Sequence, residues 1–522
     1  MANAKPYYTT DDLINSIKRR ISFPLSQNSL QYSDLIAFLN EEMQLSAVPA
    51  VKQEHEEYFV YKVTVPLING VSRYEIPNRA IGMALRDVKY SDSTGNFYDM
   101  TRIAPDDKAF FQQSNGSNQT ISKYYIEGNE IVLTPLVQGG ATGKLNFFIY
   151  LRPNSLVRNE RAAIIQNFQK DITVSSNANL EIGDTVYINT GSSTSPTPEE
   201  YIFIAVNSNP QTVDTISTSG ILTTLNPHNI PVNQSVEITL TGVTGLSPNL
   251  NGKLIGAIST GPNTFKLGES SLISPGTGGS YSIKNQFIKG SSENQTAANL
   301  KDAINLANIK NLSSTVLNSV ITITYSDIST SFSSLKIKYP VFGSAFTIDN
   351  SNLYVKFDQL PTTYTDPETM QQSGLYGVGH FVDFLQTNPG HRTYTYDIPI
   401  VSINGTVAAF AVSDLQTYLN NSSGGVLAFY NIKVGDYICL ANECIIPQIP
   451  PELHNALAER AASRVLMAIG DVQGYQISQA KLAEMNKMQE TLIGSRIEGS
   501  VPKVFNRYSL LRLGKSRFRR RY

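Results

Sequence analysis

The chain has 522 residues and a mass of 57.4 kDa, several times the length of one ordinary domain, so we expect several domains that each bury a core. Hydrophobic residues make up 41 % of the chain, charged residues 16 %, and the net charge is -1. This composition excludes a small scaffold held by disulfides or metals, and it argues against disorder over most of the length.

The charge is unevenly distributed along the chain. Residues 502–522 contain eight basic side chains and no acidic one, which leaves -9 on the remainder. Such a basic tail usually contacts a protein surface, another subunit or nucleic acid, and a solvated end is the remaining alternative. Aromatic and apolar residues interleave with the arginines, which permits contact with DNA or docking into a protein groove equally. Because no DNA-reading motif accompanies the tail, we favour a protein-docking tail, with DNA contact second. The docking candidates are Lys503, Arg507, Leu510, Leu511, Arg512, Lys515, Arg517, Phe518, Arg519, Arg520 and Arg521.

The first fifty residues show helical spacing of apolar residues. Thr10 is a candidate cap for a helix that ends at Phe23-Pro24, and a second helix runs from about Ser33 until Pro49 stops it. From about Glu57 the period changes to two, with Gly and Asn at the turns, which predicts an antiparallel β domain.

Residues 164–357 are rich in Ser, Thr, Asn and Gly and contain short, regularly spaced strands. This pattern predicts inserted β modules of sandwich type. One helix stands out within them, with Thr296 as its expected cap and Leu300, Ala303 and Ile304 on one face.

Helical spacing returns near the carboxy terminus. Pro450 and Pro451 set a helix start, Glu452 suits the positive end of its dipole, and Gly474 is expected to separate a second helix. We therefore predict an α+β fold, in which a helical core is built from both chain ends, with a large antiparallel β domain and inserted β-sandwich-like modules. The expected segments are 1–50 (helices), 51–163 (β domain, first part), 164–357 (modules), 358–449 (β domain, second part), 450–496 (helices) and 497–522 (basic docking tail).

Residue patterns that carry catalysis are missing from the sequence. The histidines are scattered, the glycine clusters lack the order of nucleotide-binding loops, and there is no nucleophile elbow. Cys439 and Cys444 have no second pair nearby, so we interpret them as half-buried strand residues. His454 fits a helix start or a subunit contact. We expect no enzyme activity, no cofactor and no metal, and no run is apolar enough for a membrane helix.

Two stretches together resemble a known family. The amino-terminal signature is Tyr74-Glu-Ile-Pro-Asn-Arg79-Ala-Ile-Gly82 followed by Leu85-Arg86-Asp87-Val88; the carboxy-terminal signature is Gly435-Asp-Tyr437 followed by Ile446-Pro-Gln-Ile-Pro450-Pro451-Glu452-Leu453-His454. Both resemble the head-to-tail connector (portal adaptor) proteins of tailed bacteriophages, mostly short-tailed ones. The closing helices, up to Arg496-Ile-Glu-Gly, are similar to a third part of that family.

The resemblance implies a structural virion protein made in the host cytoplasm and located at the head-to-tail junction. Such proteins form a ring, usually of twelve copies, beneath the portal, and extend the channel through which genomic DNA passes without sequence-specific binding. The implied partners are the portal, the next tail or ring protein and further copies of this chain, with no membrane. Arg79, Arg86 and Asp87 would form an ion pair, either within the chain or between subunits. The alternatives are a receptor-binding or decoration protein that binds sugar through its middle modules, and a phage-derived hydrolase.

Overall fold

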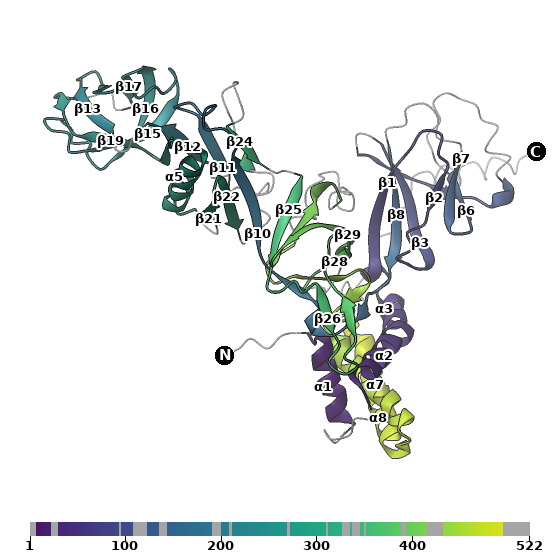
Figure 1. Cartoon of the computed structure of the whole chain (residues 1–522). Coiled ribbons are helices and arrows are strands. Elements are labelled where there is room, and N and C mark those ends of the chain that lie inside the picture. Colours follow the sequence, from purple (N-terminus) through teal and green to yellow (C-terminus); the bar gives the residue numbers. More distant parts are fainter. Residues whose placement is uncertain are drawn as a thin grey trace, which may run out of the picture. The chain divides into compact units, whose positions relative to one another are not determined.

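The structure is a computed structural model. It describes residues 7–21, 30–92, 95–107, 123–134, 143–189, 200–207, 211–268, 272–309, 312–325, 335–336, 345–348, 351–387, 393–414 and 432–493. Figure 1 shows these elements along the chain. The predicted fold class is wrong. The residues that the structure describes are mostly β, with 43 % in strands that form several sheets and 25 % in helices, and the few helices do not make a core from both ends. Helical periodicity covers only short stretches of the sequence, whereas alternating β-branched residues extend through most of it.

The chain divides into two compact units, which are described separately. Unit 1 comprises residues 1–8, 12–60 and 449–522, and unit 2 comprises residues 9–11 and 61–448. Three large clusters of buried hydrophobic side chains all belong to unit 2. Most of the apolar side chains that are buried in these clusters therefore belong to β structure.

Unit 1 contains most of the helices. Its amphipathic helices bury one apolar face each, and α2 packs against α7, which packs against α8. Ion pairs link α7 to α2 and to α1, because Arg464 Nε lies 2.6 Å from Glu42 Oε1 and Arg20 Nε lies 2.7 Å from Glu459 Oε2. The elements are α1 (Thr10–Arg20), α2 (Tyr32–Glu42), a π-helical turn (Met43–Ala47), α3 (Val48–Glu54), α7 (His454–Ala468) and α8 (Val472–Ile493).

Two helix boundaries differ from the prediction. Pro49 does not stop a helix, because it occupies the first turn of α3, where a missing N–H costs no hydrogen bond. The π-helical turn immediately before it shifts the hydrogen-bonding pattern and lets the chain remain helical. Gly470, with φ +79°, follows α7 and separates it from α8, so Gly474 lies inside α8 rather than before it.

Two four-stranded sheets begin unit 2. Alternating residues of these strands bury a common core that includes Val88, Phe147 and Ile131, as period-two spacing requires. The first sheet has the order β1 (Val60–Pro66), β8 (Lys144–Leu151), β3 (Ala80–Ser91) and β4 (Phe97–Asp99); the second has the order β2 (Arg73–Glu75), β7 (Glu130–Thr134), β6 (Lys123–Glu127) and β5 (Thr101–Arg102).

A closed circuit of six strands, named here the first barrel, follows. Its strands pair in the order β10, β25, β30, β29, β28 and β31, and β31 pairs back with β10 at Ala163 and Ile164. Phenylalanines 357, 384 and 410 fill its interior with edge-to-face ring contacts. The strands are β10 (Ala163–Val174), β25 (Asn352–Phe357), β28 (Phe381–Leu385), β29 (Thr393–Asn404), β30 (Val407–Ala411) and β31 (Tyr437–Leu440). Short pairs add β9 (Ser155–Leu156) with β32 (Glu443–Cys444), and β26 (Thr363–Thr365) with β27 (Gln372–Gly374).

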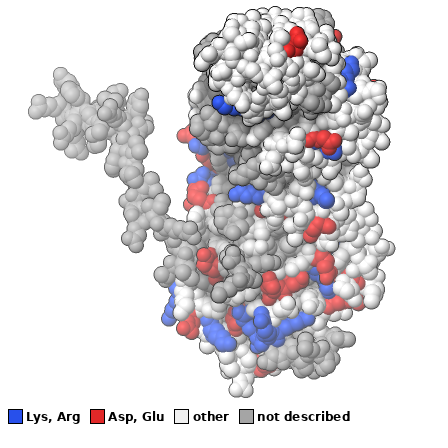
Figure 2. All heavy atoms as spheres, turned by 90° about the vertical axis from the view of Figure 1, so that its left-hand side faces the viewer, with Lys and Arg blue, Asp and Glu red and all other residues white. Residues whose placement is uncertain are grey.

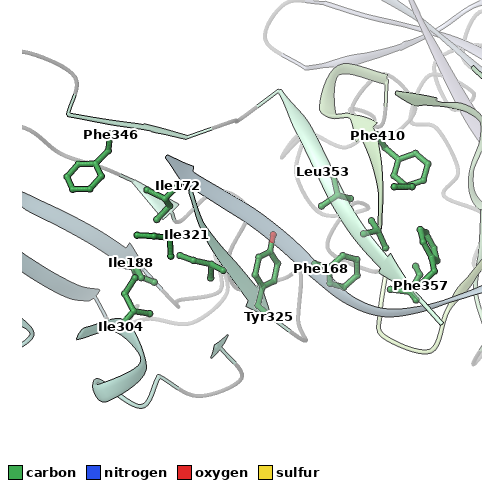
Figure 3. Close-up of a cluster of buried hydrophobic side chains, with 14 of the residues drawn as sticks. Phe168, Ile172, Ile188, Ile304, Ile321, Tyr325, Phe346, Leu353, Phe357 and Phe410 are labelled. Carbon is green, nitrogen blue, oxygen red and sulfur yellow. The ribbon is translucent and has the colours of Figure 1, made fainter. Parts of the chain in front are cut away.

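Between β10 and β25 the chain makes a long Ser/Thr-rich excursion. Figure 3 shows that its core continues along β10, from Phe168 beside Leu353 and Phe357 to Ile172 near Phe346 and Ile321. One sheet has the order β20 (Gln286–Ile288), β12 (Glu200–Val206), β11 (Thr185–Asn189) and β23 (Leu335–Lys336), and β20 runs parallel to β12 with Ile204 opposite Gln286. The other elements are α5 (Glu293–Leu306), β21 (Leu312–Leu317), β22 (Val320–Tyr325) and β24 (Phe346–Ile348).

The face of α5 was predicted correctly, but its cap was not. Leu300, Ala303 and Ile304 are buried as expected. The N-cap is Ser292, whose hydroxyl accepts a hydrogen bond from Gln295 N, whereas Thr296 lies within the helix. The Thr296 hydroxyl instead bonds to Gly290 N and to Asn177 Oδ1, so its capping chemistry serves the preceding turn.

A second barrel, rather than a sandwich, lies within the excursion. It closes because β13 pairs with both β14 and β19, and it buries Phe265 and Tyr281 at its centre. Short alternating strands satisfy a sandwich and a barrel equally, so the sequence could not distinguish the two. The strands are β13 (Gln211–Ile216), β14 (Ile221–Thr224), β15 (Ser235–Thr241), β16 (Leu254–Gly261), β17 (Thr264–Leu267) and β19 (Ser280–Ile283), with β18 (Gly276–Thr277) attached to β13.

Candidate functional site

Arg79 of the amino-terminal signature is the centre of a buried polar network in unit 2. It lies just before β3, and its side chain is only 5 % exposed. The guanidinium Nη2 donates to both carboxylate oxygens of Asp383, at 2.8 and 3.0 Å. It also donates to Asp397 Oδ1 at 2.6 Å, while Nη1 donates to Asn154 Oδ1 at 3.2 Å. One arginine thus joins three segments that are far apart in the sequence.

The two aspartates come from neighbouring strands of the first barrel. Asp383 lies on β28 between Val382 and Phe384, which belong to the hydrophobic core, so strand alternation directs the carboxylate to the other side. Asp397 lies on β29 with φ +56°, a left-handed conformation that aspartate tolerates better than most residues. Backbone N–H of Asp397 donates to Asp383 Oδ1 at 2.9 Å, which fixes the two carboxylates relative to each other.

Asn154 connects this network to the carboxy-terminal signature. Its backbone N–H donates to Gln448 Oε1 at 2.7 Å, and its side-chain amide donates to the carbonyl of Glu443 at 3.0 Å. The same amide donates to Asp383 Oδ2 at 2.7 Å. Consequently the two signatures, which lie more than three hundred residues apart in the sequence, meet at a single buried site.

Burial and charge act in opposite directions on the ionisable groups here. Burial raises the pKa of the Asp383 carboxyl, and the Arg79 charge together with three hydrogen-bond donors counteracts this. Burial likewise opposes the charge on Arg79, but hydrogen bonding to Asp397 and the charges of both aspartates outweigh it and raise the pKa of Arg79. The guanidinium also lies over the ring of Tyr396, 5.1 Å from its centroid.

The remaining residues of the amino-terminal signature lie away from this network. Arg86 is exposed on β3, and Asp87 is half-buried. The Asp87 carboxylate accepts a hydrogen bond from Val88 N and lies 3.4 Å from Lys89 Nζ. Arg79 forms its ion pairs within the chain, with Asp383 and Asp397.

The turn at the start of α7 carries the other predicted residues. Pro450 precedes a short 3-10 turn, Pro451–Leu453, in which Glu452 is exposed. His454 is fully buried: its Nδ1 accepts a hydrogen bond from Tyr8 N at 3.1 Å, and its Nε2 lies 3.3 Å from the carbonyl of Ile449. Within unit 1, His454 therefore ties the chain before α1 to the turn before α7.

The predictions for the basic tail and for the two cysteines remain to be compared with the structure. All the tail candidates, from Lys503 to Arg521, lie outside the described residues. Cys439 and Cys444 are free thiols in β31 and β32, and they are fully buried rather than half-buried. Burial raises the pKa of both thiols, which keeps them protonated and unreactive at neutral pH.

Sequence reasoning missed Asp383, Asp397 and Asn154. A usable signal existed for Asp383, because a lone carboxylate in the apolar strand Phe381–Leu385 needs a buried partner. Every polar group of the network is engaged in holding strands and turns together. The network therefore fixes three segments of the chain relative to one another.

Two comparisons with known proteins found no match. No protein-family model matches the chain, and no curated protein matches it. Among the residues that the structure describes, no group of three or more His, Cys, Asp or Glu side chains could hold a metal ion. None of the helices in that part of the chain has the length and apolar character needed to cross a bilayer.

Proposed function

We propose that this protein is a structural connector of a tailed-bacteriophage virion. It forms a ring, dodecameric as in the family it resembles, beneath the portal, joins head to tail and extends the DNA channel. The observation that carries the proposal is the Arg79 network, because the two signature stretches on which the resemblance rests are bonded to each other through it. A subunit that bears load between head and tail needs such a rigid junction more than it needs a reactive cleft.

Charge supports the same role. Outside the tail the chain carries -9, and a channel wall of like charge lets DNA slide because few phosphates are neutralised. Genomic DNA then passes without sequence-specific binding. The basic tail supplies the opposite charge at one end of the chain and engages the portal.

The sugar-binding alternative has no observation in its favour. It requires exposed aromatic residues grouped on the middle modules, whereas the exposed large side chains in the described part of the second barrel are aliphatic, such as Ile221, Leu225 and Leu254. Figure 2 shows that this barrel, at the top of the view, has an almost uncharged surface on the visible side.

Electron cryo-microscopy of the protein mixed with its phage's portal tests the proposal. A coaxial ring at the narrow end of the portal is the expected result. Location at the tail tip or on the capsid surface in virions would overturn the connector proposal and would favour a receptor-binding or decoration role.

The contribution of the tail is tested separately. Deletion of residues 502–522 should abolish portal attachment while leaving the circular dichroism and melting of the remaining chain unchanged. A variant of full length, with the basic residues of the tail replaced by glutamine, separates charge from apolar docking. Normal attachment by the deleted protein would refute the assignment of the tail.

A further inference from the structure

Unit 1 contains a cavity beside the ion pair of Arg464 and Glu42. It lies between α2, α7 and α8 and has a volume of about 190 Å³. An apolar cavity of about 150 Å³ is large enough to take benzene, so this one has room for a side chain. Its walls include Glu42, Arg460, Arg464, Met467, Tyr475 and Leu482.

The two arginines of the wall differ in their partners. Arg464 is neutralised by Glu42 at 2.6 Å, with Glu41 at 3.5 Å on its other side. Arg460, one turn earlier on α7, donates to the neutral amide oxygen of Asn486 at 2.7 Å. Within the described part of the chain, no carboxylate forms an ion pair with Arg460. Its guanidinium therefore retains donors for a further acceptor.

The rest of the wall restricts what that acceptor can be. Met467 and Leu482 provide an apolar surface that suits a short aliphatic stem. Glu42, which is only 6 % exposed, places a fixed negative charge in the wall. Arg464 neutralises that charge, so the guanidinium of Arg460 alone faces an incoming anion, and one cation matches a singly charged carboxylate better than a doubly charged phosphate. A planar carboxylate also matches the fork of an arginine.

We propose that this cavity is a binding site for a glutamate side chain of a protein partner, with Arg460 as the residue that binds its carboxylate. The methylene groups of the glutamate contact Met467 and Leu482. The inference goes beyond the connector role, since the site stands whichever protein provides the acidic side chain. It also differs from the proposed docking of the basic tail, because the charge of the incoming group is opposite.

Methyl NMR on the full-length protein tests the site directly. The chain has only eight methionines, so ¹³C-methyl labelling gives few signals, and Met467→Leu identifies the reporter in the wall. The probes are N-acetylglutamate methylamide, its neutral glutamine analogue and inorganic phosphate. We expect the glutamate probe to shift the Met467 signal with a Kd in the millimolar range.

Variants complete the test. Arg460→Gln should weaken the glutamate probe about tenfold or more, Arg460→Lys should weaken it less, and Arg19→Gln, on the exposed side of α1, should leave it unchanged. Circular dichroism verifies the folding of each variant. Equal shifts with the glutamine analogue, a stronger response to phosphate, no response up to about 50 mM probe, or full binding in folded Arg460→Gln would each overturn the proposal.

Discussion

Replacement of Arg79 by methionine is the most direct test of the buried network. The substitution keeps much of the aliphatic volume but leaves Asp383, which is 0 % exposed, without its cation. Removing one partner of a buried ion pair costs about 3–5 kcal/mol, and the lost donor to Asn154 adds about 1 kcal/mol. Asp397 is one-third exposed and adds little because water screens it. We expect the free energy of unfolding to fall by about 4–6 kcal/mol at pH 7.

The loss should depend on pH. Without Arg79, the pKa of Asp383 rises further above its value in the unfolded chain, because burial raises it and the opposing charge is gone. An acid with a raised pKa in the folded state loses stability as the pH increases through that pKa. The deficit of Arg79→Met should therefore be larger at pH 8 than at pH 5.

Urea unfolding followed by circular dichroism and tyrosine fluorescence measures both effects, since the chain has 27 tyrosines and no tryptophan. Arg73→Met is the matched control, because Arg73 pairs with Glu127 and Glu130 on the surface, and its effect should be far smaller. Adding Asp383→Asn to Arg79→Met should recover part of the loss. A loss in Arg79→Met no larger than that in Arg73→Met would refute the reasoning.

Three further expectations concern other parts of the chain. Arg464→Met leaves the buried carboxylate of Glu42 without its partner and should destabilise unit 1 by about 2 kcal/mol, seen as faster hydrogen exchange in α2 and α7. Phe265→Ala empties the centre of the second barrel and should cost about 3–5 kcal/mol; Leu225→Ala, at an exposed site, should melt like the unmodified protein. Burial lowers the pKa of Lys62 to about 8, so unfolding titrations should show stability rising from pH 8 to about 10.5 and a flatter profile for Lys62→Met.

Local periodicity in the sequence was sufficient to predict several helices and strands. The spacing of Leu13, Ile14 and Ile17 predicted α1, and all three side chains are buried. The apolar face of α5 was found in the same way. These successes depend on residues a few positions apart, whose relationship is fixed by helix geometry alone.

The closure of the sheets into barrels could not be predicted from local periodicity. Ala163 on β10 pairs with Ile438 on β31, and Ile165 on the same strand pairs with Phe357 on β25. Such pairings depend on the global path of the chain, so alternation predicted strands without predicting which strands would be neighbours. The partners of Arg79 were missed for the same reason, since Asp383 and Asp397 lie more than three hundred residues from it in the sequence.

The parallel pairing of β12 with β20 brings together the two points where the chain leaves for the second barrel and returns from it. Ile204 lies opposite Gln286 and Val206 opposite Ile288. Ile204 and Val206 also belong to the hydrophobic core of the barrel. A foreign domain with adjacent termini that covers Ile204 and Val206 could therefore replace residues 207–284 and leave the strands around it paired. That position offers a defined place for a fluorescent reporter or an affinity handle.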